Sequence, residues 1–326
     1  MNIVQLFRAA ALALLAVSAV AHGQAPAAYP NQPIHLLVPF SAGGGQDIFV
    51  RQLLPRLQER LGQPVVVENR PGASGNIAAE AVARAVPDGY TLLLGTAATH
   101  GMNQALQPVL PFDAQKSFEP VAHIADVPLV LVVHPSVPAS NVDELVSWLK
   151  ADPGRATYGS SGTGAPLHLA GELFKRVAGV EALHVPYKGS APAIVDLIAG
   201  RIHFMFDTFA ATNPHVRSGA LRRIGVAAPR RARGDPDLPT LGEQGYAVDA
   251  YSWSAVFAPA GTPPAVVARL ADAFAVAAND PALGPKLGEI GFEPVSGSGP
   301  DELRAFVASE LKKWADVVRA ADIKRE

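Results

Sequence analysis

The stretch Ile34-His35-Leu36-Leu37-Val38-Pro39-Phe40, followed by Ser41-Ala42-Gly43-Gly44-Gly45, decides the class of fold. A short apolar run is typical of a buried strand in a parallel sheet, and a loop of small residues ends it. Residues 47–61 then carry isoleucine and leucine at helical spacing and stop at Gly62, a common helix terminator. Strand, loop and helix in this order form the first unit of a β-α sheet.

The same alternation repeats outward along the chain. Expected strands cover residues 65–67, 90–94, 127–133, 157–159, 183–185, 202–206, 221–227 and 251–257. Expected helices cover residues 76–85, 96–106, 141–151, 167–177, 191–199, 263–278 and 300–319. Asn76 is expected to cap the first of these, and Ser140 or Asn141 the helix at 141–151. We therefore predict an α/β protein with two comparable halves, in each of which helices flank a mainly parallel sheet.

Composition excludes several classes of protein. A length of 326 residues predicts about two domains. The chain has no cysteine, which excludes a disulfide scaffold, a cysteine-ligated metal site and a thiol nucleophile. Its net charge of −2 offers no basic surface for nucleic acid, and the arginines of residues 229–233 are interpreted as a solvated loop.

The first 23 residues have the pattern of a secretory signal peptide. Arg8 precedes an apolar run over residues 9–20, and small residues then offer cleavage frames at 19–21 and 21–23. The run is shorter than the roughly 20 residues that span a bilayer, although an uncleaved anchor is the alternative. With no cysteine for a lipid, we expect a soluble, exported protein that is not lipid-anchored.

The sequence lacks the familiar enzyme motifs. The chain has no P-loop, and the dinucleotide pattern that Gly43 could begin would need glycine where Ile48 stands. The nucleophile elbow fails because Thr163 replaces its last glycine. No metal-binding pair of histidines lies one helical turn apart. We therefore predict no catalytic residue, no metal and no cofactor.

Small-residue loops follow the expected strands of both halves. Residues 41–45 form the first loop, and residues 160–164 form the second loop. Thr96, which follows the third strand, is a further candidate ligand contact. Ligands of open α/β sheets bind at the carboxyl ends of strands, where glycine lets backbone N–H groups approach and a helix start favours an anion. Neither loop contains lysine or arginine, so neutral hydrogen bonds would hold that anion. Ordinary turns are the alternative for each loop alone, but two loops favour a cleft between the halves.

Motifs spread along the chain resemble one family. They are Val38-Pro39-Phe40-Ser41-Ala42-Gly43-Gly44, Asn69-Arg70-Pro71-Gly72-Ala73-Ser74-Gly75-Asn76-Ile77, Pro87-Asp88-Gly89-Tyr90-Thr91-Leu92, Tyr158-Gly159-Ser160-Ser161-Gly162-Thr163-Gly164 and His184-Val185-Pro186-Tyr187-Lys188-Gly189. Together they resemble the Bug-type extracytoplasmic solute receptors of tripartite tricarboxylate transporters. The resemblance implies a two-lobed periplasmic-binding-protein fold with crossover strands near residues 125–127 and 251–253. Lobe one would comprise residues 24–125 plus 253–326, and lobe two residues 126–252.

The resemblance also implies a ligand and its contacts. The ligand would be a small carboxylate, delivered to the membrane permease subunits of the transporter by a monomeric receptor. Carried over residue by residue, the ligand-binding set is Phe40, Ser41, Ala42, Gly43 and Gly44 from lobe one and Ser160, Ser161, Thr163 and Gly164 from lobe two. Asp207 matches a ligand-side position or, alternatively, caps the helix that starts near Thr208. Asp47 is expected to stabilise the first loop, and His168 to pack behind the second.

Two other functions are alternatives to uptake. An exported hydrolase or transferase could use the same kind of sheet, and turnover by purified protein would support it. A ligand sensor that feeds a signalling kinase would have the same lobes, and capture of a kinase in place of a permease would support it.

Overall fold

The computed structural model describes residues 29–43, 45–107, 109–187, 189–296, 298–321 and 323. The signal peptide predicted for residues 1–23 and the candidate residue Gly44 lie outside the described residues. The elements below all belong to one structural unit that starts at Gln32. Within the described part of the chain, no helix is long and apolar enough to cross a membrane.

Six strands form the first sheet, in the order β11-β4-β10-β3-β1-β2. β1 (Ile34–Val38), β2 (Val65–Asn69) and β3 (Thr91–Thr96) pair in parallel. β10 (Ser252–Pro259) runs antiparallel to both β3 and β4 (Phe118–Val127), and the short β11 (Glu293–Pro294) runs antiparallel to β4. The first sheet therefore combines strands from the beginning and the end of the chain.

Five strands form the second sheet, in the order β7-β6-β8-β5-β9. β6 (Thr157–Ser160), β7 (Leu183–Pro186) and β8 (Phe204–Thr208) pair in parallel. β5 (Leu129–Val133) runs antiparallel to β8 and to β9 (Arg222–Val226). The predicted α/β class with two lobes is confirmed, but each sheet is mixed, with parallel pairing limited to three strands.

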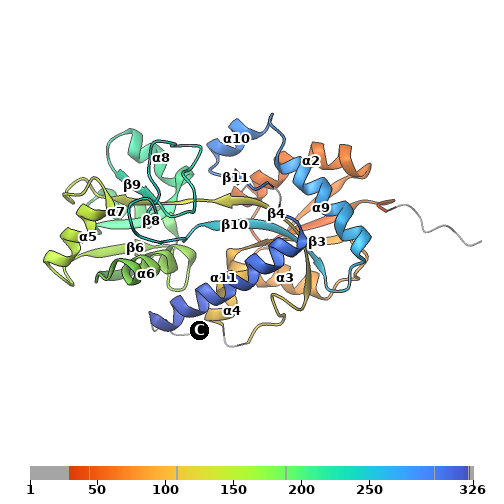
Figure 1. The fold of residues 1–326 in the computed structure, drawn as a ribbon, viewed down its shortest axis with the longest axis horizontal. Helices are drawn as coiled ribbons and strands as arrows, with labels where there is room; N and C mark the ends of the chain where they lie inside the picture. Colours follow the sequence, from red (N-terminus) through yellow and green to blue (C-terminus); the bar gives the residue numbers. More distant parts are fainter. Residues whose placement is uncertain are drawn as a thin grey trace, which may run out of the picture. The chain divides into compact units, whose positions relative to one another are not determined.

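The crossovers explain this mixture. β4 leads out of the first sheet directly into β5, and β10 returns beside β4, so the two run side by side in opposite directions (Figure 1). A strand that returns to the first lobe from the second runs in the opposite direction to the strands that point toward the second lobe. Antiparallel pairing at β10 and β5 is therefore a consequence of the two crossings.

Helices cover both sheets. In the first lobe α2 (Gly45–Leu61) packs against α9 (Pro264–Ala278), and α3 (Asn76–Ala83) packs against β3 and β10. The second lobe carries α5 (Val142–Ala151), α6 (Pro166–Ala178), α7 (Ser190–Ile198) and α8 (Phe209–Arg217), and α10 (Gly284–Glu289) precedes β11. The long α11 (Pro300–Ala320) contacts β4, α9 and α6, so it touches elements of both lobes (Figure 1).

Several local predictions needed correction. The helix expected over residues 96–106 is a π-turn, η3 (Ala98–Met102), followed by the short α4 (Asn103–Leu106). Asn76 does not cap α3; it is the first helical residue, after Gly75, and its side chain bonds other amides. Asn141 does cap α5, because its side chain accepts from the Glu144 N–H over 2.9 Å.

A buried carboxylate joins β10 to α11. The indole nitrogens of Trp253 and Trp314 both donate to Glu310 Oε2 over 3.0 Å, and Lys313 forms an ion pair with the same carboxylate. Both indoles are fully buried. Each buried donor and the buried charge have partners, so this polar cluster fixes the helix on the crossover strand without leaving a polar group unsatisfied.

Candidate functional site

The first loop is held by one buried acid. Asp47, only 3% exposed at the start of α2, accepts from the Gly43 N–H over 2.9 Å, from Arg51 Nε over 2.8 Å and from Asn69 Nδ2 over 3.0 Å. Asn69 Nδ2 also donates to the Phe40 carbonyl oxygen. The hydrogen bond from Arg51 is the main reason that the pKa of Asp47 falls to about 2. At neutral pH a full negative charge therefore ties the loop to β2 and α2.

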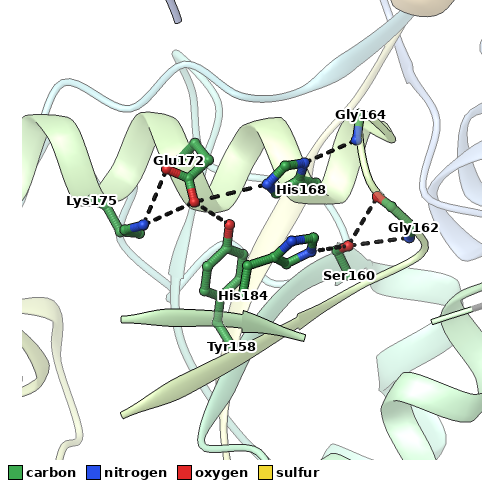
Figure 2. A network of polar contacts seen from close by, with 8 residues as sticks. All are labelled: Tyr158, Ser160, Gly162, Gly164, His168, Glu172, Lys175 and His184. Carbon is green, nitrogen blue, oxygen red and sulfur yellow. Dashed lines mark hydrogen bonds and ion pairs between the residues drawn. The ribbon is translucent and has the colours of Figure 1, made fainter. Parts of the chain in front are cut away.

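The second loop is braced from inside by two side chains, shown in Figure 2. Ser160 Oγ accepts from the Gly162 N–H over 3.1 Å, and His168 Nδ1 accepts from the Gly164 N–H over 2.9 Å. These bonds occupy the N–H groups of the two glycines. Within the described part of the chain, no hydrogen-bond partner occupies the N–H groups of Ser161 and Thr163, which alternate with them.

Two stacked imidazoles lie behind this loop. The rings of His168 and His184 stack with centroids 3.8 Å apart, and His184 Nε2 lies 2.7 Å from Ser160 Oγ (Figure 2). Burial lowers the pKa of His168 and lowers that of His184 to about 4, so both rings are neutral at pH 7. Because His168 Nδ1 accepts from Gly164, its proton is on Nε2, the nitrogen that faces Glu172.

The contact between Ser160 and His184 raises the question of a nucleophile. A serine activated by histidine needs its oxygen open to a substrate. Ser160 is 0% exposed, and its hydroxyl already holds the loop through Gly162. The pair therefore supports the backbone of the loop and offers no accessible nucleophilic oxygen.

Backbone strain marks the segment that follows β2. Ala73 and Ser74 have φ values of +47° and +53°, which non-glycine residues rarely adopt, and Gly72 and Gly75 flank them at positive φ. A Cβ on Gly75 would lie 2.7 Å from Thr99 Cγ2 and 3.0 Å from Pro39 Cβ, so glycine is required at this close approach. The segment is thus pressed against Pro39, which follows β1, and against η3 at the carboxyl edge of the sheet.

A cavity of about 320 Å³ joins the second loop to this edge. From the second lobe it is lined by the second loop and the start of α6; from the first lobe it is lined by Ser74 and residues 98–107. A Cβ on Gly164 would touch Leu106 at 3.4 Å, which shows how closely the two sides meet. Among the described residues that line the cavity, none carries a charged side chain.

The structure brings some predicted ligand contacts together and leaves others apart. Ser161, Thr163 and Gly164 line the cavity. The described part of the first loop does not: Ser41, Ala42 and Gly43 are exposed elsewhere on this edge, and Phe40 is half-buried. The remaining three predicted ligand contacts have buried side chains outside the lining, namely Thr96, Ser160 and Asp207.

The side chains of Asp207 and Thr96 are directed into the protein. Asp207 is 2% exposed and accepts from Ser190 Oγ and from the Thr208 N–H, and burial raises its pKa. The cap of α8 is Thr208, whose hydroxyl accepts from the Ala211 N–H over 3.3 Å. Thr96 Oγ1 is buried, and within the described residues it has no hydrogen-bond partner.

The cavity also contains residues that sequence reasoning did not assign. From the first lobe they are Ser74, Ala98, Met102, Asn103, Leu106 and Gln107, and from the second lobe Gly162, Ala165 and Pro166. One signal was present: Ser74 stands in a glycine-rich loop after the second strand, at the same carboxyl edge as the first loop. Asn103 and Gln107 gave no such signal, because their positions depend on how the chain turns at η3.

A comparison with known families identifies the chain. The model described as tripartite tricarboxylate transporter family receptor matches residues 49–323. The chain belongs to this family. Its receptors are periplasmic solute-binding proteins. Protein BugT of Bordetella pertussis, strain Tohama I, is 39% identical to this receptor over 298 residues, which cover 91% of each chain.

Solved structures of other receptors have the same fold. A protein of R. palustris, solved with adipate, is 39% identical, covers 91% of this receptor and 99% of its own chain, and superposes with a TM-score of 0.75. MatC from Rhodopseudomonas palustris, solved with bound malate, is 32% identical, covers 89% of this receptor and all of its own chain, and has a TM-score of 0.72. These proteins support the two-lobed fold described above.

Proposed function

We propose that this receptor captures a small carboxylate anion between its two lobes and delivers it to the membrane permease subunits of a tripartite transporter. The related receptors solved with adipate and malate support a carboxylate as ligand. A cavity of about 320 Å³ is large enough for an acid of that size.

One observation supports this proposal most directly. The second loop uses the N–H groups of Gly162 and Gly164 internally, on Ser160 and His168, and so presents Ser161 and Thr163 at the cavity. Free N–H and hydroxyl groups beside the first turn of α6 are suited to a carboxylate, because they donate hydrogen bonds at the positive end of a helix dipole. An anion held without a cationic side chain can be bound and released reversibly.

The first loop is proposed to complete the site on closure. Two-lobed receptors close by hinge motion about their crossover strands, here β4 and β10. Closure would add Phe40, Ser41, Ala42, Gly43 and Gly44 to the ligand shell. Ser160 then acts as a support for the second loop through its hydrogen bond with Gly162.

Export and organisation complete the proposal. We infer that residues 1–23 are a cleaved signal peptide and that the mature receptor is a periplasmic monomer without a lipid anchor. Lobe one comprises residues 24–125 plus 253–326, and lobe two residues 126–252. The placement of β10 and β11 in the first sheet supports a first lobe that the end of the chain completes.

A thermal-shift screen with isothermal titration tests the function. Purified receptor is titrated with adipate, malate and related acids at pH 7. A true ligand binds only the folded state, so the melting temperature rises with its concentration. Thr163→Ala should weaken binding of the best acid by about five- to tenfold, because it removes a hydroxyl that lines the cavity.

Ser309→Ala is the matched control, since this hydroxyl is exposed on α11 and bonds the Phe306 carbonyl outside the cavity. It should leave the affinity unchanged. Absence of binding for every acid, or equal affinity in Thr163→Ala and the wild type, would contradict the proposed site.

A further inference from the structure

Three amide side chains form a connected chain at the first-lobe side of the cavity. Asn103 Nδ2 donates to the Ser74 carbonyl oxygen over 3.0 Å and to Asn76 Oδ1 over 2.7 Å. Asn76 Nδ2 in turn donates to Gln107 Oε1 over 2.7 Å. Asn76 and Asn103 are buried, so water competes little for these hydrogen bonds.

This chain fixes the orientation of the Gln107 amide. Because Oε1 accepts from Asn76, the Nε2 group is the end that is left to donate. Within the described residues, Nε2 has no hydrogen-bond partner. Gln107 lines the same cavity as Ser161 and Thr163, but from the other lobe, and apolar Met102 and Leu106 line the space beside it. The cavity therefore has donors for an anion on one side, an apolar wall, and on the other side Gln107, whose uncharged Nε2 group is left to donate.

We propose that Gln107 selects small organic acids that carry an oxygen acceptor at the end remote from the bound carboxylate. A second carboxylate, a carbonyl or a hydroxyl would accept from Nε2, whereas an alkyl end would leave that donor unpaired. A site that holds a polar group rejects the ligand that lacks its partner, because the unpaired group has lost its hydrogen bonds to water. This inference rests on the proposed carboxylate function and names the class of acid within it.

Asn76 acts as a positioning residue in this arrangement. Asn76→Asp keeps the oxygen that accepts from Asn103 but removes the group that donates to Gln107 Oε1. The Gln107 amide then turns its Nε2 toward the new carboxylate and its oxygen toward the cavity. Selectivity should shift from acids with a remote acceptor to acids with a remote donor, such as the monoamides of the same diacids.

Isothermal titration with matched acids tests the proposal. Succinate, glutarate and adipate are each compared with the unbranched monoacid of equal length, and with the corresponding monoamide. The wild type should prefer the diacid of its best length by about fivefold or more. Gln107→Leu should bring this ratio close to one while leaving monoacid affinity unchanged, and Asn76→Asp should raise the affinity for the monoamide relative to the diacid.

Gln104→Leu, on the short helix α4 that ends just before Gln107, is the matched control. Its amide is exposed and accepts from the Ala114 N–H, away from the cavity, so selectivity should not change. If Gln107→Leu melts like the wild type yet keeps the full preference, the role of Gln107 is wrong although the carboxylate function stands. If the wild type binds none of these acids, the proposed function fails and this inference fails with it. Gln107→Ala gives the same discrimination should the leucine variant fold poorly.

Discussion

Asp47 shows how one buried charge can organise a loop that carries no charge of its own. Its three hydrogen-bond partners, Gly43, Arg51 and Asn69, are all donors. A carboxylate offers two acceptor oxygens and no donor, so it suits all three at once. The first loop therefore stays uncharged at its surface while its shape depends on a charge behind it.

Asp47→Asn should lower the free energy of unfolding by about 2 kcal/mol. The substitution removes a charge-assisted hydrogen bond and leaves one buried N–H donor facing another. An asparagine has only one oxygen, so its NH₂ group must face at least one of the three N–H donors. Urea denaturation at pH 7 measures the loss. Asp237→Asn, an exposed carboxylate, is the control and should change stability by less than about 0.5 kcal/mol.

The hydrogen bonds of Asp47 also predict that the stability of the receptor depends on pH. The folded-state pKa of Asp47 is about 2, below its ordinary value of 3.8. Its stabilisation is therefore complete above pH 3.8 and is lost as the pH falls through 2. The difference between the wild type and Asp47→Asn should shrink over that range, and a constant difference would show that the charge is not the cause.

Ser160 and Ser161 show why the sequence alone did not assign every ligand contact correctly. Ser160 and Ser161 are indistinguishable as hydroxyls in a glycine-rich stretch, and both were assigned to the ligand. The structure separates them, because Ser160 ends β6 with its side chain buried toward His184, whereas Ser161 lies after the strand and lines the cavity. The order of buried and exposed positions at a strand end depends on register, which composition does not contain.

At the scale of elements, local patterns predicted most helices and strands. Apolar runs and periodic leucines are local properties, and the elements they mark fall within a few residues of their expected bounds. The start of β4 was missed because Phe118 is followed by a charged residue and a proline, which weaken a strand pattern. The π-turn at η3 was missed because small residues there give no helical period. Gln107 could not be assigned for the same reason, since that turn sets its direction.

Helix α6 meets β6 with almost no free space, and this contact predicts a second effect on stability. A Cβ on Gly171 would lie 2.3 Å from Tyr158 Cε2. Tyr158 is fully buried and donates to Glu172, so its ring has little room to move (Figure 2). Gly171→Ala should destabilise the receptor by about 1–3 kcal/mol despite the better helix propensity of alanine.

Thermal or urea unfolding of Gly171→Ala measures this cost, with Arg176→Ala as the control. Arg176 is exposed on the same helix and should change stability by less than about 0.5 kcal/mol. Because β6 and α6 flank the second loop, ligand affinity should fall along with stability. A variant as stable as the wild type would show that the strand and the helix can separate without cost.

In the complete receptor, the connection between the lobes determines the direction of the strands in each sheet, which the pattern of elements did not predict. Alternating strands and helices predicted a parallel sheet in each half, but a chain that crosses and returns must pair β10 against its neighbours. Only the family resemblance indicated the crossings, because no local pattern records which sheet a strand joins. The crossings also bring charged side chains of the connection after β9 against β4 and β11.

An ion pair at this place predicts a change in local stability. The Arg233 N–H donates to Glu293 Oε1 over 2.6 Å, and Arg233 Nε lies 3.0 Å from Oε2. Glu293 belongs to β11 of the first sheet, whereas Arg233 lies in the connection that leaves β9 of the second. The carboxylate is largely buried, so this contact is screened less than a surface pair. It therefore holds the connection between the lobes against the first sheet.

Glu293→Gln removes the charge from this contact and should speed hydrogen exchange at the Arg233 amide by about five- to tenfold, since local opening then costs about 1 kcal/mol less. Exchange measured by mass spectrometry over residues 229–236 tests this. Glu119→Gln, whose partner Arg304 is half-exposed, is the control and should leave that segment unchanged. Equal protection from hydrogen exchange in Glu293→Gln and the wild type would mean that the backbone after β9, and not the ion pair, holds this connection against the first sheet.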